Sequence, residues 1–414
     1  FFPHGLDVDN IAATRALLAR LQAKRPAPRL ADVSIEDVQI TVRTLEHLRA
    51  GVRVSTANAA CSSLADAAAA SVPSSVISPA IASTDACGDS TTLPPPASGA
   101  PPLTLRCYQP RAARGEPRPA LLWCHGGGFM FGELSWDDKR CQQLALALDC
   151  LVVAVDYRLA PEQPFPAALE DGYAALCWMA DHAASLGIDR SRIAVAGASA
   201  GGGLAAGLAL LARDCGQPSV CFQLLLYPML DDRTVLAPTA LDTSAQDSSA
   251  QDSPASTSAN TVCAAALPTA VTTALTPTPG WSLEENTAGW QCYLGVRSTL
   301  QGSVLAAKRR AANAVQDGAP SAVSAYAAPS RATDLRALPP AFMAVGSIDL
   351  FYGECCDYAA RLQQAGVAVE LQCYANAFHG FDSWASASNT AKRCWAEQCA
   401  ALQQAFYSNK DHTR

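Results

Sequence analysis

The chain has 414 residues, of which 50% are hydrophobic and only 16% are charged, so it can bury a sizeable core and is not disordered throughout. Its formal net charge is −7 and no lysine- or arginine-rich run stands out, which argues against nucleic acid or an anionic membrane surface as a partner. No apolar run reaches the ~20 residues of a transmembrane helix, and no signal peptide opens the chain. We therefore expect a cytoplasmic protein, although the first residue is Phe1 rather than methionine, as in a processed or truncated chain.

Sixteen cysteines are present, but their spacing is irregular and no Cys-x-x-Cys motif occurs. This pattern argues against a zinc site, and we expect neither a bound metal ion nor a disulfide framework. In a chain of this length the cysteines are expected to be free thiols in a reducing compartment.

Three stretches, at 51–102, 233–280 and 299–321, are rich in Ala, Ser, Thr or Pro and lack bulky apolar residues. Such a composition buries too little surface to offset the entropy of the chain, so we expect flexible insertions there. Without them there remain an N-terminal region, 1–50, and a single catalytic domain, 103–407, which the second and third insertions interrupt.

In chain order, the first predicted elements are two amphipathic helices, at 8–24 and 34–49, which would form either a cap over the site or a packing element. Short apolar runs then alternate with helical patterns. The predicted strands lie at 120–123, 151–155, 192–196, 222–227, 341–345 and 369–374. The predicted helices follow Ser135 and lie at 166–182, 200–213, 352–365 and 390–407. This alternation predicts an α/β fold with a mostly parallel central sheet and helices on both faces.

A candidate nucleophile lies where the strand at 192–196 runs into Gly197-x-Ser199-x-Gly201. The flanking glycines allow a turn so tight that the serine is exposed at the N-terminus of the next helix, where the helix dipole favours developing negative charge. Together with Gly203, the same glycines also resemble the phosphate-binding turn of a short-chain dehydrogenase. Against that alternative, at least two strands precede the turn and no Tyr-x-x-x-Lys occurs.

A glycine loop, His125-Gly126-Gly127-Gly128, directly follows the strand at 120–123. Three consecutive glycines contribute little to packing and cost entropy, but they let backbone N–H groups approach a ligand closely. That property suits an oxyanion hole, in which each well-placed donor is worth ~100- to 1,000-fold in rate. The alternative is a flexible surface turn, and the position directly after a buried strand argues against it.

A serine hydroxyl needs a base, and His379 is the natural one among six histidines because it follows a predicted strand by a few residues. The other five lie at the termini, in the N-terminal region, at a helix end or in the glycine loop, and are His4, His47, His125, His182 and His412. His379 is therefore the candidate general base.

The acid of a catalytic triad should follow another strand and lie between the serine and the histidine in the chain, and Asp349 fits both conditions. It would hold the tautomer of the histidine and stabilise the imidazolium. Glu354 falls inside the following helix and is interpreted as a supporting residue. Asp156 also follows a strand, but it precedes the serine, so we interpret its segment as a buried ion-paired brace.

These motifs together resemble the hormone-sensitive-lipase group of α/β-hydrolases, a family of carboxylesterases. The resemblance spans roughly 103–400 with interruptions. It rests on HGGG at 125–128, YRLAPE at 157–162, FPA at 165–167, GASAGG at 197–202, YP at 227–228, LPP at 338–340, DLF at 349–351 with Glu354, and HGF at 379–381. The order of so many motifs makes the resemblance specific, and it implies the α/β-hydrolase fold.

The resemblance also implies roles for individual residues. Ser199 would be the nucleophile, Asp349 the acid and His379 the base. The oxyanion would be held by the backbone N–H groups of Gly126, Gly127 and Ala200. The supporting residues would be His125, Gly128, Gly197, Gly201 and Glu354.

Other family properties are expected with it: an N-terminal helical cap at 1–50, short-chain acyl esters as substrates, no cofactor, and frequent homodimers. Ala198 stands where the family usually has Asp or Glu, so the loop-bracing network of that carboxylate is not expected in its usual form. Gly353 replaces an Asp found in many members, and the insertion at 233–280 is atypical and lies near the expected substrate-binding region.

The sequence thus predicts a serine carboxylesterase that hydrolyses short-to-medium-chain acyl esters through an acyl-enzyme, with a small-molecule ester as its partner. One alternative is an amide or acyl-amine hydrolase with the same triad. Another is a ligand-binding homologue without activity, against which the presence of His379 argues.

Overall fold

Eight strands form a single sheet in the computed structural model, which describes residues 6–24, 27–42, 102–112, 115–236, 280–296 and 323–408. The strands are β1 (Val33–Ile40), β2 (Leu103–Pro110), β3 (Arg118–Cys124), β4 (Leu151–Val155), β5 (Ile188–Ala198), β6 (Gln223–Leu226), β7 (Ala341–Gly346) and β8 (Val369–Tyr374). Their order across the sheet is β1-β2-β4-β3-β5-β6-β7-β8. β2 runs antiparallel to both neighbours, and the six strands from β4 across to β8 are parallel. The predicted mostly parallel sheet is confirmed.

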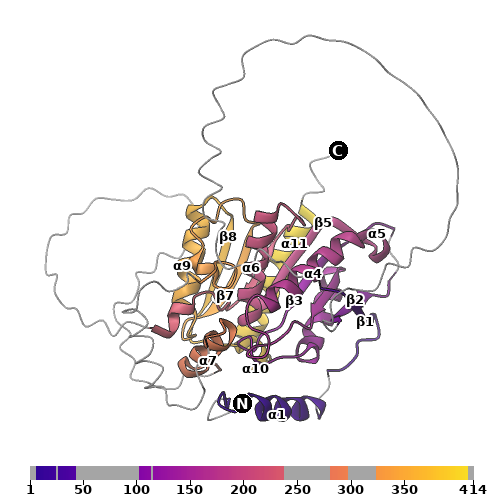
Figure 1. Cartoon of the computed structure of the whole chain (residues 1–414). Helices are drawn as coiled ribbons and strands as arrows, with labels where there is room; N and C mark the ends of the chain where they lie inside the picture. Colours follow the sequence, from indigo (N-terminus) through magenta and orange to yellow (C-terminus); the bar gives the residue numbers. More distant parts are fainter. Residues whose placement is uncertain are drawn as a thin grey trace, which may run out of the picture.

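Helices cover both faces of this sheet, as the sequence predicted (Figure 1). α4 packs against α6, and α3 packs against α11. The helices, with 3-10 turns marked η, are α1 (Ile11–Ala23), η1 (Leu134–Asp137), α3 (Asp138–Leu148), α4 (Ala167–Asp181), α5 (Ala183–Leu186), α6 (Ala200–Cys215), η2 (Asp232–Leu236), α7 (Leu283–Tyr293), η3 (Pro329–Arg331), α9 (Tyr352–Gln364), α10 (Phe381–Trp384) and α11 (Asn389–Tyr407).

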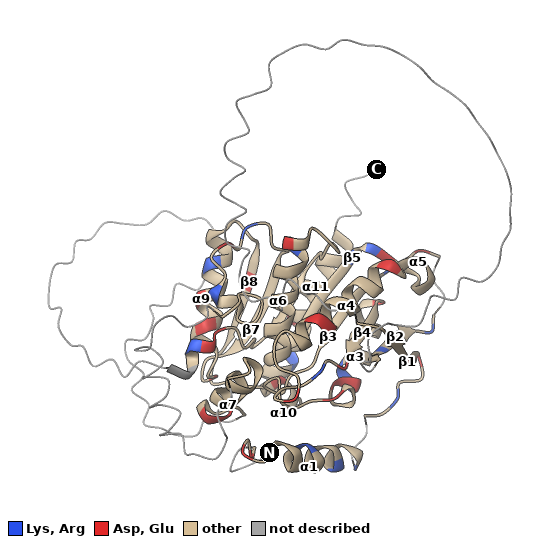
Figure 2. Ribbon diagram, viewed as in Figure 1, with Lys and Arg blue, Asp and Glu red and all other residues tan. Residues whose placement is uncertain are grey.

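The central strands are buried on both sides, which explains their nearly continuous apolar sequences. Every residue of β3, β4, β6 and β7 is buried. Parallel strands enclosed by helices lose the alternation of apolar and polar residues that a half-exposed strand shows. In Figure 2, acidic and basic residues are interspersed on the helices and loops around a largely uncharged sheet.

The helix predicted at 34–49 is wrong where the structure describes it, because Val33–Ile40 is the edge strand β1. Ile35, Val38 and Val42 are spaced three and four residues apart, which resembles a helical face. They are β-branched, however, and β-branched side chains fit a pleated strand better than a helix. β1 pairs along its whole length with β2, a strand that the sequence analysis also missed.

The helix that the structure describes in the N-terminal region is α1, which lies at one edge of the molecule (Figure 1) and contacts the segments that follow β3 and β4. Arg15 of α1 donates hydrogen bonds to the carbonyl oxygens of Met130, at 2.8 Å, and Ala160, at 2.7 Å. It also forms an ion pair of 2.9 Å with Glu162. The N-terminal helix is thereby fixed to the segments that follow two central strands.

The three stretches predicted to be insertions lie almost wholly outside the described residues, so their flexibility and the domain limits drawn from them stay predictions. No disulfide joins the cysteines within the described ranges. None of the helices that the structure describes is long and apolar enough to cross a membrane.

Candidate active site

Ser199 lies in a tight turn between β5 and α6, with φ 57° and ψ −123°. Two glycines make this turn possible. A Cβ atom on Gly197 would lie 2.2 Å from the carbonyl oxygen of Gly201, and one on Gly201 would lie 2.1 Å from the carbonyl oxygen of Cys124. Neither position therefore has room for a side chain, and the close packing holds the serine at the N-terminus of α6.

Ser199, His379 and Asp349 form one hydrogen-bonded chain. The Oγ atom of Ser199 lies 2.9 Å from Nε2 of His379. On the other side of the ring, Nδ1 lies 2.9 Å from Oδ2 and 3.1 Å from Oδ1 of Asp349. The backbone N–H of Phe351 donates to Asp349 Oδ1 at 2.9 Å. The side chain of Asp349 is fully buried, so water does not compete for this carboxylate.

These three residues follow β5, β7 and β8 in the chain order Ser, Asp, His. The structure thus brings together the nucleophile, acid and base that the sequence predicted. The imidazole is enclosed by aromatic rings: those of Tyr227 and Phe351 meet it edge-on, with centroids at 4.9 and 5.0 Å. Such an apolar surround keeps solvent from the ring and strengthens its hydrogen bonds.

A second polar group, which sequence analysis missed, secures the segment after His379. The hydroxyl of Tyr227 donates to Asp382 Oδ1 at 2.6 Å, and Arg140 forms a 2.6 Å ion pair with Asp382. Both charged side chains are largely buried. Asp382 is three residues beyond His379, so the ion pair ties the histidine segment to α3, and the Tyr227 hydrogen bond ties it to the end of β6.

The glycine loop lies directly against Ser199. A Cβ atom on Gly126 would lie 3.4 Å from the Cβ of Ser199, and Gly127 has φ 120°. Among the described residues, no hydrogen bond uses the backbone N–H of Gly126 or Gly127. Ala200 is the first residue of α6, so its N–H has no acceptor within the helix. The three predicted oxyanion donors therefore flank the serine.

The other two predicted members of the loop have packing roles. Gly128 has φ 60°, and a Cβ atom there would lie 2.3 Å from the ring of Trp281. His125 does not join the serine: it is buried, stacks on Tyr157 with ring centroids 4.1 Å apart, and bonds through Nδ1 to the carbonyl oxygen of Gly126 at 2.8 Å. Burial lowers its pKa, so the ring is neutral and acts as a brace.

The segment after β4 contains an ion-paired brace, as predicted. The Arg158 guanidinium pairs with Asp171 at 2.9 Å and with Glu170 at 3.2 Å, and both carboxylates are fully buried. The Tyr157 hydroxyl donates to the carbonyl oxygen of His125 at 2.8 Å. Asp156 itself is exposed and stands outside this group.

Glu354 of α9 supports the segment that follows β6. Its carboxyl accepts hydrogen bonds from the backbone N–H of Leu230, at 2.7 Å, and from the hydroxyl of Thr234. Burial raises the pKa of Glu354 to about 8. The same segment carries Met229, whose N–H donates to the carbonyl oxygen of Ser199 at 2.9 Å. Glu354, predicted as a supporting residue, is thus linked to the serine turn through Leu230 and its chain neighbour Met229.

The raised pKa of Glu354 has a measurable effect on stability. Between its ordinary pKa of 4.5 and the folded value of about 8, the folded protein keeps a proton that the unfolded chain has lost, so stability falls as pH rises through this window. In Glu354→Gln the neutral amide cannot titrate, and we expect a flatter dependence of Tm on pH between 5 and 8.5. Glu370→Gln on the exposed face of β8 is the control. Parallel curves for all three proteins would contradict this prediction.

Within the described ranges, no group of three or more His, Cys, Asp and Glu side chains is placed to hold a metal ion.

Known proteins are similar to this chain in fold and in sequence. A model of the alpha/beta hydrolase fold family matches residues 121–274 and 273–383. Esterase LipI of Mycobacterium tuberculosis is 34% identical over 303 residues, which cover 73% of this chain and 78% of the relative. Carboxylesterase NlhH of the same species is 34% identical over 306 residues, covering 74% and 79%. A solved structure titled Bacterial Heroin Esterase superposes with a TM-score of 0.66 and 30% identity, over 97% of this chain and 93% of that one.

The fold and the site define an α/β-hydrolase, and the chain belongs to the alpha/beta hydrolase fold family. Within it, the predicted membership of the hormone-sensitive-lipase-like group of carboxylic ester hydrolases is confirmed.

Proposed function

We propose that this chain is a serine carboxylesterase that hydrolyses short-to-medium-chain acyl esters through an acyl-enzyme. The observation that carries the proposal is the hydrogen-bonded chain from Ser199 through His379 to the buried Asp349. The three backbone donors that flank the serine support it.

In the first half of the reaction, Ser199 Oγ attacks the carbonyl carbon of the ester while His379 Nε2 takes the hydroxyl proton. The negative charge that develops on the carbonyl oxygen accepts hydrogen bonds from the N–H groups of Gly126, Gly127 and Ala200. The intermediate collapses when His379 returns the proton to the leaving alcohol. In the second half, water attacks the acyl-serine by the same route and releases the acid.

Asp349 acts through the histidine. Its carboxylate accepts a hydrogen bond from Nδ1–H, which leaves Nε2 unprotonated and directed at Ser199. When the ring takes the serine proton, the buried negative charge of Asp349 stabilises the imidazolium. The N–H of Phe351 keeps the carboxylate in place for both tasks.

The substrate proposed is a small-molecule ester, in keeping with relatives named esterase, carboxylesterase and, for a protein of Pseudomonas putida, ethyl acetate hydrolase. The ring of Trp281 packs over Gly128 and lies 6.4 Å from the His379 ring, which limits the space beside the serine and favours short acyl chains. A homodimer, a cytoplasmic location and a cap formed by the helical part of 1–50 on a catalytic domain at 103–407, whose sheet also includes β1, complete the proposal.

The proposal is tested with a series of p-nitrophenyl esters from acetate to palmitate, together with labelling by a fluorophosphonate. We expect the highest kcat/KM from acetate to octanoate, and mass spectrometry should locate the phosphonyl group on Ser199. A matched p-nitroanilide series distinguishes an amide hydrolase, which would cleave the anilides at comparable rates. Absence of turnover with every ester, or a label on another residue, would contradict the proposal.

A further inference from the structure

An unusual set of polar atoms lies in the segment from Trp281 through α7. Among the residues that the structure describes, eight buried side-chain nitrogen and oxygen atoms have no hydrogen-bond partner, and four of them belong to this segment. They are Nε1 of Trp281, Nε1 of Trp290, and both Oδ1 and Nδ2 of Asn286. Asn286 has no exposed surface at all. A buried amide with neither half bonded destabilises a fold by a few kcal/mol, so such a residue calls for a functional explanation.

The position of α7 shows which part of the molecule Asn286 faces. Residues three, four and seven apart share one face of a helix, so Asn286 lies on the face of Gly289 and Tyr293. A Cβ atom on Gly289 would lie 2.9 Å from the carbonyl oxygen of Gly128, and the Tyr293 ring stacks on Phe129 at 3.8 Å. This face of α7 therefore packs onto the glycine loop beside Ser199.

Trp281 marks the other limit of the same region. It precedes α7, and its ring lies against Gly128 and 6.4 Å from the ring of His379. Asn286 follows it by five residues, and the N–H of Asn286 donates to the carbonyl oxygen of Ser282 at 3.0 Å. The side-chain amide of Asn286 thus lies in the segment from Trp281 to Gly289, which covers the glycine loop.

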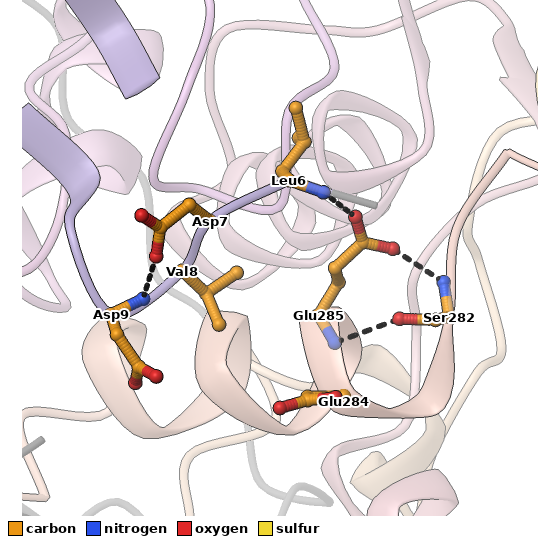
Figure 3. A pocket seen from close by; sticks show the side chains of 7 residues that line it. All are labelled: Leu6, Asp7, Val8, Asp9, Ser282, Glu284 and Glu285. Carbon is orange, nitrogen blue, oxygen red and sulfur yellow. Dashed lines mark hydrogen bonds between the residues drawn. The ribbon is translucent and has the colours of Figure 1, made fainter. Parts of the chain in front are cut away.

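Neighbouring polar side chains on α7 have partners, in contrast to Asn286. Glu285 accepts hydrogen bonds from the N–H groups of Leu6, at 2.6 Å, and Ser282, at 2.7 Å (Figure 3). The hydroxyl of Thr287 donates to the carbonyl oxygen of Leu283 at 2.7 Å. Helix capping and packing of the N-terminal segment therefore do not explain the asparagine.

We propose that Asn286 is a substrate-recognition residue, whose amide, with the indole N–H of Trp281, hydrogen-bonds an oxygen atom on the ester outside its reacting carbonyl. Preferred substrates are then esters whose acyl or alcohol part carries an ether, hydroxyl or amide oxygen. The indole and the amide NH₂ supply donors for an acceptor oxygen, and Oδ1 accepts from a hydroxyl or N–H. This inference rests on the proposed esterase function and specifies its substrate class.

Selectivity follows from the cost of leaving the amide unbonded. A plain alkyl ester leaves both halves of the Asn286 side chain unpaired after it has entered the site, whereas an oxygenated ester of the same shape pairs at least one of them. Since the difference persists in the transition state, it appears in kcat/KM.

The test uses two pairs of esters, and within each pair one CH₂ group of the first ester is replaced by an oxygen atom in the second. The acyl pair is p-nitrophenyl butyrate and p-nitrophenyl methoxyacetate, and the alcohol pair is butyl butyrate and 2-methoxyethyl butyrate. For each pair, the ratio of kcat/KM values is measured for the wild type, Asn286→Leu, Asn286→Ala and the control Thr287→Val. Dividing the ratio measured for a variant by the ratio measured for the wild type cancels the difference in intrinsic reactivity between the two esters.

We expect both Asn286 variants to lower the preference for the oxygenated ester by about 10-fold or more in one of the two pairs, which also shows whether the oxygen belongs to the acyl or the alcohol part. Thr287→Val should leave both ratios within twofold of the wild type. Unchanged ratios in both Asn286 variants would overturn the inference. If these variants then also had a higher Tm than the wild type, the Asn286 amide would only be hydrated. If they had a lower Tm, the amide would make a structural hydrogen bond. If the wild type hydrolyses none of the four esters, the proposed function itself fails.

Discussion

Replacing Ser199 with alanine is expected to lower kcat for ester hydrolysis by on the order of 10⁴- to 10⁶-fold, because the variant has no nucleophile and keeps only the backbone donors. The fold should be unaffected, since the hydroxyl is bonded to His379 and the turn is held by Gly197 and Gly201. The residual rate of hydrolysis is measured with p-nitrophenyl butyrate at high enzyme concentration, and the Tm of the variant shows whether its fold is intact.

A matched control is available in Ser330→Ala. Ser330 is as deeply buried as Ser199, and its Oγ has no hydrogen-bond partner. This variant should retain wild-type kcat. Turnover by Ser199→Ala within about 10-fold of the wild type would show that another group performs the attack.

Replacing Asp349 with asparagine is expected to lower kcat by about 10⁴-fold, with a much smaller change in KM. The amide of asparagine would donate to Nδ1 of His379, which forces the proton onto Nε2, and a protonated Nε2 cannot accept the proton of Ser199. The effect is one of tautomer and charge, since shape and packing are nearly the same in both side chains. Steady-state kinetics with p-nitrophenyl butyrate measures it.

Asp357→Asn on α9 provides the comparison for Asp349→Asn. Asp357 is largely exposed and pairs only loosely with Arg361, at 3.8 Å. A weak surface pair of this kind contributes little, so kcat should stay within twofold. Equal losses in the two variants would remove Asp349 from the mechanism.

The three reacting side chains could be predicted from sequence because each follows a strand directly and the strand sequences are strongly apolar. Ser199 stands in a motif whose glycines are required by sterics, and elimination among six histidines isolates His379. Asp349 was then fixed by its place between them in the chain. Local sequence is therefore enough to predict a site residue when that residue is positioned by the end of the strand directly before it.

Other features depend on pairings that no local pattern encodes. β1 acquires its strand conformation from β2, which lies far along the chain, and its own spacing of apolar residues fits a helix equally well. Arg140 and Asp382 are 242 residues apart, and neither has a neighbouring signal. The burial of Asn286 follows from how α7 packs on the glycine loop, which helix periodicity alone does not tell.

The contacts of α1 also bear on the order in which the molecule assembles. Arg15 is synthesised before its carbonyl partners at Met130 and Ala160, which follow 115 and 145 residues later. A helix of 13 residues is barely stable alone in water, so α1 has nothing to hold it until the loops after β3 and β4 have formed. Although α1 precedes these segments in the chain, it is thus expected to dock only after the segments that follow β3 and β4 have folded.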